Sequence, residues 1–439
     1  MSLSPLAKDL NEIICRENKN IYEMLSGCGK HLFFPKGIIS QSAEAAEHAS
    51  LYNATIGIAV ENSQPMYLES VKKLVPESFS AEEIFPYASS KGLPELRKLW
   101  QKRQRLKNPS IKQSSLPMVT NALTHGLSLL GNLFFNPGDQ VILPDQFWGN
   151  YKLLWGIHHQ AQINIFSMFD DQLNGLNLEA LQQKAFCQDS DKVVLVLNFP
   201  NNPTGYTLVE EESQYILKLC SELTAKGKKV IVVCDDAYAG LSFEESCKKE
   251  SLFGELSELD SKLLAVKIDG CTKEHFMWGF RVGFVTFGIK GGTEALYNAL
   301  ETKLAGSIRG GISNVNHIGQ RVLLESLKSS CIEKEVEDKK SILQARYFKT
   351  KEVVFSSKYK NYWDVYPFNS GYFMCLRLKG VEAESVRLEL LHSFKVGAIA
   401  TSKTDLRIAF SCLELRDIEP LFKCVAEAVE RLLPADNTM

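Results

Sequence analysis

The chain alternates between short, continuous apolar runs and segments with apolar residues at helical spacing. Residues 194–197 and 230–233 consist only of Val, Leu and Ile. Uninterrupted runs of this kind are typical of strands that are buried on both faces of a parallel sheet. Between them, residues 209–225 have apolar residues at roughly helical spacing. The pattern therefore predicts a βαβ unit.

Polar motifs follow both predicted strands of this unit. Asn202-Pro203-Thr204-Gly205 comes shortly after the first strand, and Asp235 with Tyr238 comes directly after the second. Ligands of open α/β sheets bind beyond the carboxyl ends of the strands. Three further apolar runs, at 140–144, 263–268 and 279–287, predict strands that bring Trp148, Lys273 and Arg281 to the same edge.

A predicted helix start completes this edge. Residues 118–121 end a strand or loop and run into Ala122-Leu123-Thr124, which opens a helix. The first N–H groups of a helix have no partner within the helix, so they are suited to binding a phosphate.

The pattern changes near residue 320, which is where we expect a domain boundary. A helical stretch at 316–354 is followed by short strands at 371–378 and 405–410 and by a closing helix at 417–433. We predict a large domain at 76–320 and a smaller α/β domain formed by 321–439 together with the N-terminal segment 1–75.

Composition narrows the classes of function. The chain has 439 residues, enough for two or three domains, and its formal net charge of -2 does not suggest a nucleic-acid partner. Its 11 cysteines form no C-x-x-C pair and no cluster with histidine, so we expect no metal and a reducing cytoplasm. Charged residues near the N-terminus and the lack of long uncharged apolar windows predict neither a signal peptide nor a membrane span.

The side chains expected at this edge of the sheet suit a particular cofactor. A lysine can form an imine, and a carboxylate can keep a ring nitrogen protonated. Pyridoxal phosphate needs this arrangement to act as an electron sink.

Three motifs carry a resemblance to a known family: Thr272-Lys273 with Arg281 and Gly283 downstream, Asn202-Pro203-Thr204-Gly205, and Asp235-x-x-Tyr238. Together they resemble the class I/II pyridoxal-phosphate-dependent aminotransferases of the aspartate aminotransferase fold (fold type I), over about residues 56–413. The resemblance implies an α/β fold in which helices sandwich a mostly parallel sheet in the large domain. It also implies a smaller α/β domain.

The resemblance implies a role for each cofactor-binding residue. Lys273 matches the Schiff-base lysine that also moves the substrate's α-proton, and Asp235 matches the partner of the pyridinium nitrogen. Asn202 and Tyr238 resemble the donors to the phenolic oxygen, and Trp148 resembles the ring that stacks on the cofactor. The phosphate site would comprise Arg281, Thr272, Thr124, the backbone of Ala122 and Leu123, and Tyr87 from across a subunit boundary. A homodimer with shared sites is therefore expected.

The substrate site follows from the same resemblance. Arg407 matches the arginine that binds the α-carboxylate, and Gly57 and Asn202 are expected to border the substrate. Arg309 stands where aspartate aminotransferases place an arginine for the distal carboxylate, although the usual Asn-Pro-Pro continuation is absent. Dicarboxylic and aromatic amino acids both remain candidate substrates.

Some residues depart from the family pattern or have ordinary structural alternatives. Gly270 stands where the family places a serine, so one phosphate contact is expected to be lost or replaced. Ala122-Leu123 replaces a glycine-bearing pair. Aspartate also favours helix N-caps, and Asp236 is the better candidate for that role. Lone lysines are usually on the surface, and lone aromatic residues usually pack in a core.

We predict a ping-pong aminotransferase that moves an amino group between an L-amino acid and a 2-oxo acid. Both substrates are small molecules. An alternative is a pyridoxal-phosphate-dependent lyase or an enzyme like the aminocyclopropane-carboxylate synthases, whose Gly-Ile-Ala-x-Glu-Asn run is similar to residues 57–62. A binding or regulatory module that has kept the fold is a further alternative.

Overall fold

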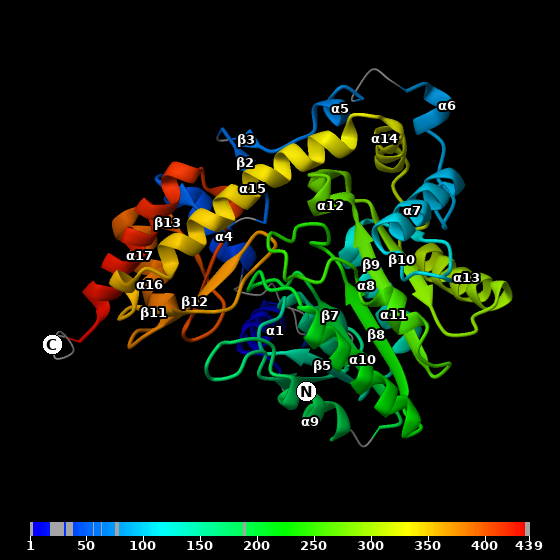
Figure 1. The fold of residues 1–439 in the computed structure, drawn as a ribbon, viewed down its shortest axis with the longest axis horizontal. Coiled ribbons are helices and arrows are strands. Elements are labelled where there is room, and N and C mark those ends of the chain that lie inside the picture. The colour runs from blue at the N-terminus through cyan, green and yellow to red at the C-terminus, as the bar shows by residue number, and fades with distance from the viewer. Residues whose placement is uncertain are drawn as a thin grey trace.

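The computed structural model describes residues 3–17, 30–31, 38–55, 57–62, 64–74, 79–187 and 190–434. Its main sheet has seven strands (Figure 1). Their order is β4 (Met118–Thr120), β10 (Gly283–Gly288), β9 (Leu263–Gly270), β8 (Lys229–Asp235), β7 (Lys192–Asn198), β5 (Gln140–Pro144) and β6 (Gln162–Phe166). β10 runs antiparallel to β4 and β9 on either side of it, and the other neighbouring strands pair in parallel. The predicted α/β class with a mostly parallel sheet is confirmed.

The predicted βαβ unit lies at the centre of this sheet. β7 and β8 are joined by α10 (Glu210–Ala225) and pair in parallel, with Asn198 opposite Asp235 at their carboxyl ends. Successive residues of each strand pack into two different hydrophobic clusters, one on each face of the sheet. Burial on both faces explains why neither strand alternates between apolar and polar residues.

Two predicted elements have different limits in the structure. The strand expected at 279–287 begins only at Gly283, because Trp278–Phe280 forms a 3₁₀ turn and Arg281 has a left-handed backbone with φ of 54°. The helical stretch expected at 316–354 is divided into α14 (His317–Lys328) and α15 (Ile332–Val354).

Helices cover the main sheet. The remaining ones in this part of the chain are α7 (Pro94–Lys107), α8 (Ala122–Phe134), α9 (Leu178–Phe186), α11 (Phe253–Ser257), α12 (Cys271–Glu274) and α13 (Glu294–Gly311), with a π-helical segment η1 (Lys152–Ile157). α8 packs on β9, β10 and α13. Its first residues therefore lie near the carboxyl end of β9.

A second, four-stranded antiparallel sheet occupies the C-terminal part, shown in orange in Figure 1. Its order is β11 (Trp363–Val365), β12 (Met374–Leu378), β15 (Asp405–Ile408) and β14 (Ile399–Ala400). Near it lie α4 (Ile38–His48), α15, α16 (Ala383–Glu389) and α17 (Ile418–Leu432). β1 (Tyr52–Asn53) pairs with β13 (Val396–Gly397), which joins the N-terminal segment to this part.

Short elements make up the rest. They are α1 (Pro5–Glu17), the β2 (Val60–Glu61) and β3 (Gln64–Pro65) pair, α5 (Glu69–Lys72), α6 (Ala81–Ile84), and the segments η2 (Trp278–Phe280), η3 (Ser357–Tyr359), η4 (Leu390–Phe394), η5 (Phe410–Cys412) and η6 (Leu415–Asp417). In the part of the chain that the structure describes, no helix combines the length and the apolar character needed to cross a bilayer.

The domain limits remain a prediction. The limit at residues 75 and 76 lies outside the described residues, and the limit at residue 320 falls inside α14. α14 packs on α7, α6 and α5, whereas α15 packs on α17 and η5. The neighbours therefore change between α14 and α15, some ten residues after the position that the hydrophobic pattern suggested.

Candidate active site

A cavity of about 270 Å³ lies at the carboxyl ends of β7, β8 and β9 and at the start of α8. All of the predicted site residues except Tyr87 and Arg309 line it: Gly57, Ala122, Leu123, Thr124, Trp148, Asn202, Asp235, Tyr238, Thr272, Lys273, Arg281 and Arg407. Side chains that are far apart in sequence therefore meet at one site, although their chemical roles remain predictions.

Asp235 is a buried carboxylate at the end of β8, with 3% of its surface exposed. Its Oδ2 accepts a hydrogen bond from the Tyr151 hydroxyl, whereas its Oδ1 is buried and has no protein partner. Burial raises the pKa of Asp235 to about 6, and the hydrogen bond from Tyr151 opposes that rise. One oxygen is thus held in place and the other is free to accept an N–H from a ligand.

Lys273 lies on the short helix α12, immediately after β9. Its Nζ donates to the carbonyl of Gly57 at 3.0 Å and lies 5.2 Å from the centroid of the Tyr238 ring. Burial, together with the charges of Arg407 and Arg281, lowers the pKa of Lys273 to about 8. About a tenth of this amine is therefore neutral, and so nucleophilic, at pH 7.

The start of α8 forms one end of the cavity. Its N-cap residue Asn121 makes no side-chain cap, so the N–H groups of the first turn face this end without that partner. Thr272 contributes a buried hydroxyl that has no hydrogen-bond partner in the described chain, and the exposed Arg281 also lines the cavity. Donors of this kind suit a phosphate.

Two departures from the family pattern have steric consequences here. A Cβ on Gly270 would lie 2.7 Å from the carbonyl of Val282, so the serine that the family places there would require a backbone shift. Ala122 has φ of 67°, a left-handed conformation that glycine adopts without strain. Ala122 therefore begins α8 in a strained conformation.

Arg407 approaches from β15 of the second sheet and is 1% exposed. Its guanidinium donates to Asn202 Oδ1 at 3.0 Å and to the carbonyl of Thr55 at 2.8 Å, and it stacks 4.1 Å from the centroid of the Phe373 ring. Its buried Nε has no partner. This cation therefore retains a hydrogen-bonding group for a further anion.

Two predicted site residues lie elsewhere. Tyr87 is 89% exposed and does not line the cavity of its own chain. Arg309 is exposed on α13 and donates to Ser313 Oγ at 2.6 Å. Their expected functions, one of them across a subunit boundary, remain predictions.

The sequence did not reveal several residues that line or border the cavity. Asn198 accepts the N–H of Asn202 and donates to the carbonyl of Asp235, so it connects the two motifs. Tyr151 is the N-cap residue of η1, contacts the ring of Trp148 edge-on at 5.6 Å and donates a hydrogen bond from its hydroxyl to Asp235. Phe373 precedes β12 and covers Arg407. Only the position of Asn198 at a strand end could have indicated it, because the contacts of Tyr151 with Asp235 and of Phe373 with Arg407 join distant segments.

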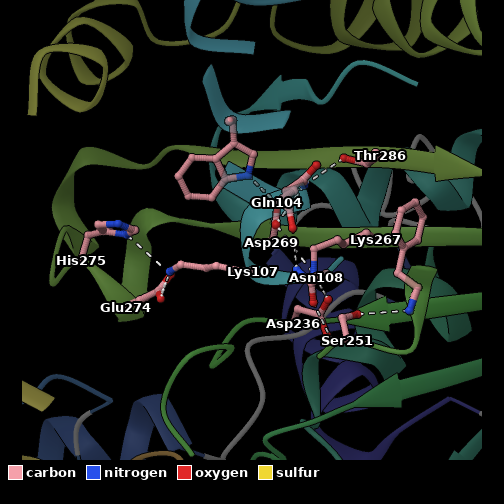
Figure 2. A network of polar contacts seen from close by, with 12 residues as sticks. Gln104, Lys107, Asn108, Asp236, Ser251, Lys267, Asp269, Glu274, His275 and Thr286 are labelled. Carbon is pink, nitrogen blue, oxygen red and sulfur yellow. Dashed lines mark hydrogen bonds and ion pairs between the residues drawn. The ribbon is translucent and has the colours of Figure 1, made fainter. Parts of the chain in front are cut away.

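The prediction that Asp236 caps a helix was wrong. No helix begins there, and Asp236 forms an ion pair with Lys267, a residue that is 2% exposed on β9 (Figure 2). Lysines are almost never fully buried unless they are paired. The apolar run around Lys267 concealed this partner.

The described residues fit the predicted cofactor. The unpartnered Oδ1 of Asp235 can accept the ring N–H of pyridoxal phosphate, and Thr272 with the start of α8 can hold its phosphate. Lys273 supplies the primary amine that its aldehyde requires. Among the described residues, no cluster of three or more His, Cys, Asp or Glu side chains is placed to bind a metal ion.

Curated relatives match part of the chain. The probable N-acetyl-LL-diaminopimelate aminotransferase of Bacillus subtilis is 26% identical over 266 residues, which cover 58% of this chain and 62% of that protein. An aspartate aminotransferase of Sulfurisphaera tokodaii is 28% identical over 222 residues, covering 49% and 50%. The alignments thus span about half to three fifths of these relatives.

Solved structures match nearly the whole chain. An aminotransferase from Anaerococcus prevotii superposes with a TM-score of 0.80 at 21% identity, covering 90% of this chain and 97% of that one. A kynurenine aminotransferase of Pyrococcus horikoshii, solved in complex with PMP, gives 0.78 at 19% identity, covering 95% and 99%. At these identities the similarity establishes the fold, which confirms the predicted aspartate aminotransferase fold.

Residues 56–424 match the family described as Aminotransferase class I and II, whose members depend on pyridoxal phosphate. The match confirms the predicted family and cofactor, and the relatives support the predicted class of enzyme. The chain belongs to the class I and II aminotransferases.

Proposed function

We propose that this chain catalyses the ping-pong transfer of an amino group between an L-amino acid and a 2-oxo acid, with pyridoxal phosphate as cofactor. The observation that carries the proposal is the meeting of Lys273, the half-partnered Asp235 and the buried Arg407 around one cavity. The names of the curated relatives agree with it.

Different residues of the chain have different functions in the proposed reaction. When bound, pyridoxal phosphate supplies an aldehyde for the amino group and a ring that withdraws the electrons left when the Cα proton departs. Lys273 Nζ is the group that takes up this proton and returns it, because its lowered pKa allows both protonation states near neutral pH. Asp235 Oδ1 holds the ring N–H, and Tyr151 fixes the orientation of that carboxylate.

Arg407 binds and orients the substrate. Its guanidinium offers the free Nε to the α-carboxylate while Asn202 and Thr55 hold the other nitrogens. A carboxylate anchored there directs the Cα–H bond towards Lys273, which lines the same cavity. The rings of Phe373 and Trp148 line the same cavity and exclude water from the surface that they cover.

We also propose a cytoplasmic homodimer. Tyr87 and Phe85 are largely exposed, and Ile312 and Ile318 are partly exposed. The carbonyl of Pro86 lies 2.6 Å from His317 Nδ1, so these apolar side chains belong to neighbouring segments. An exposed apolar surface of this kind is suited to a second copy. None of the ten cysteines of the described residues forms a disulfide bond, which agrees with a reducing compartment.

The proposal is tested by incubating purified protein with pyridoxal phosphate, glutamate and a panel of 2-oxo acids. We expect new amino acids in step with 2-oxoglutarate, and borohydride reduction followed by peptide mapping should place the label on Lys273. Lys273→Ala should lower turnover by at least about 10³-fold and abolish the label. Ammonia or pyruvate release without an acceptor would favour the lyase, and a chain that binds no pyridoxal phosphate would favour the binding module.

A further inference from the structure

A second cavity of about 410 Å³ lies behind the candidate cofactor site. Charged side chains that form a buried network are among the residues that line it. Figure 2 shows this network, which lies between α7, the ends of β8 and β9, and the neighbouring loops. Asp235 lines the first cavity, and the adjacent Asp236 lines the second. The end of β8 therefore presents one carboxylate to each cavity.

Lys267 is the cation of this network. Its Nζ donates to Asp236 Oδ2 and lies 3.8 Å from Asp269 Oδ2, and the residue is 2% exposed. Asp269 also accepts hydrogen bonds from Trp100 Nε1 at 3.0 Å and Gln104 Nε2 at 3.0 Å. The two carboxylates are thus shared by one ammonium and two neutral donors.

Stability alone is a weak reason for such a pair. Replacing a buried ion pair by apolar residues of similar size is often neutral or stabilising, because both ions lose their hydration. Lys267 lies on β9 between Val266 and Ile268, which are fully buried. Burying the Lys267 ammonium therefore costs free energy, and the stability of the ion pair alone is a weak reason for it.

A use for this charge follows from the neighbouring residue. A cofactor with a protonated ring nitrogen requires Asp235 to be ionised, and an uncompensated carboxylate at Asp236 would oppose that ionisation in a buried setting. We propose that Lys267 is a positioning residue that neutralises Asp236 and so keeps Asp235 ionised for the ring N–H. This inference rests on the proposed function and concerns how the site is tuned.

Lys267 is the cation that pairs with Asp236. Arg103 and Lys248 also line the second cavity, but Arg103 pairs with Glu333, and Lys248 pairs with Glu210 and Glu255. Asp235 faces the hydroxyls of Tyr151 and Tyr238, while Lys273, Arg281 and Arg407 lie around the cofactor cavity. Around Lys267 the charged or titratable neighbours are Asp236, Asp269 and the Cys234 thiol. Lys107, Glu274 and the buried His275 form a separate group on the far side of the network, where Lys107 pairs with Glu274.

The test measures the affinity of the cofactor-free full chain for two probes between pH 5 and 8. One is pyridoxal phosphate, and the other is a phosphorylated benzaldehyde in which carbon replaces the ring nitrogen. The titrations of Lys273 and of the phosphate affect both probes, so the ratio of the two dissociation constants reports on the ring nitrogen and its contact with Asp235. In the wild type we expect this ratio to change through a midpoint that Asp235→Asn abolishes.

Lys267→Met should raise this midpoint by about one pH unit, because Asp236 then repels the charge on Asp235. Asp236→Asn should lower it, since the carboxylate next to Asp235 is removed while Asp269 keeps Lys267 protonated. The double variant Lys267→Met/Asp236→Asn should return the midpoint to the wild-type value. A purely structural pair would weaken folding without moving the two single variants in opposite directions.

The outcomes separate the two proposals. A wild type that binds neither probe contradicts the proposed function. The inference is overturned, while the function stands, if the wild type has a clear midpoint and Lys267→Met leaves it unchanged. It is also overturned if the double variant keeps the shift of Lys267→Met. If Lys267→Met does not fold, Asp236→Asn decides: a lower midpoint supports the inference and an unchanged one overturns it. Asp269→Asn, which removes a carboxylate not adjacent to Asp235, is the matched control.

Discussion

The two cavities on either side of the end of β8 differ in how completely their polar groups are paired. In the cofactor cavity, Asp235 Oδ1, Thr272 Oγ1 and Arg407 Nε are all buried without a protein partner. In the cavity behind it, the Lys267 ammonium is paired and Asp269 accepts two neutral donors, while Arg103 Nε is buried without a partner. Buried polar groups in native proteins are normally satisfied. A carboxylate oxygen, a hydroxyl and a guanidinium nitrogen left unpaired around one cavity therefore mark that cavity as the one suited to a ligand with both donors and acceptors.

The sharpest test of this comparison exchanges one carboxylate on each side for its isosteric amide. Asp235→Asn should lower turnover by about 10²–10³-fold, because the ring nitrogen loses its anionic partner, without lowering the free energy of unfolding of the cofactor-free chain. Asp269→Asn should do the reverse. It should cost about 2 kcal/mol of stability, because Trp100 and Gln104 lose a charged acceptor, and leave turnover within a few-fold.

Both variants are compared by steady-state kinetics and by urea unfolding of the cofactor-free chain. If Asp235→Asn destabilises the chain as much as Asp269→Asn does, the distinction between a ligand-binding and a structural carboxylate is wrong.

The sequence predicted the main sheet well, because its strands are buried on both faces and are read as continuous apolar runs. β7, β8 and α10 lie within a residue or two of their expected limits. Local backbone conformation was harder to predict. The left-handed Arg281 delays the start of β10, and the break between α14 and α15 has no glycine or proline to mark it.

The cofactor cavity could be predicted because its residues follow strands whose carboxyl ends meet. Asn202, Asp235 and Lys273 are of this kind. The second cavity could not be predicted, because the pairing of Lys267 with Asp236 depends on the register of two strands. In that register Cys234 stands opposite Lys267, and nothing in the local sequence of either strand specifies it.

A second test concerns the free Nε of Arg407. Arg407→Lys should lower kcat/KM for amino acids by about 10²-fold, since an ammonium cannot make the forked contact that a guanidinium makes with a carboxylate. Arg377→Lys on the neighbouring strand β12 is the matched control, because Arg377 stacks on Tyr366 outside the cavity. Equal losses in the two variants would show that the effect reflects disturbance of the sheet.

A third test uses the pH dependence of the Lys273 amine. Its pKa of about 8 leaves roughly a tenth of the amine neutral at pH 7. The rate at which an amine-selective reagent labels Lys273 in the cofactor-free chain should therefore rise about tenfold from pH 7 to 9 and then level off. Nα-acetyl-lysine, with its ordinary pKa, should continue to gain reactivity above pH 9. A Lys273 profile parallel to that of the free amine would contradict the effect of burial.

The sign of the linked effect on stability follows from the same shift. The folded-state pKa of Lys273 lies below its ordinary value of 10.5, so protonated Lys273 destabilises the fold below about pH 8. This cost disappears as the pH rises from about 8 to 10.5. Lys273→Met should therefore stabilise the cofactor-free chain at pH 7 and lose that advantage above pH 10.

The smallest expected effect concerns the backbone of the cofactor side. Ala122 opens α8 with φ of 67°, where a Cβ costs about 1 kcal/mol and glycine costs nothing. Ala122→Gly should therefore stabilise the cofactor-free chain by about 0.5 kcal/mol after the greater entropy of glycine in the unfolded state is subtracted. Ala299→Gly, at an exposed interior position of α13, should instead destabilise it by about 1 kcal/mol. The same sign for both substitutions in urea unfolding would show that Ala122 is not strained, and the contrast between the two cavities would then rest on unpaired polar atoms alone.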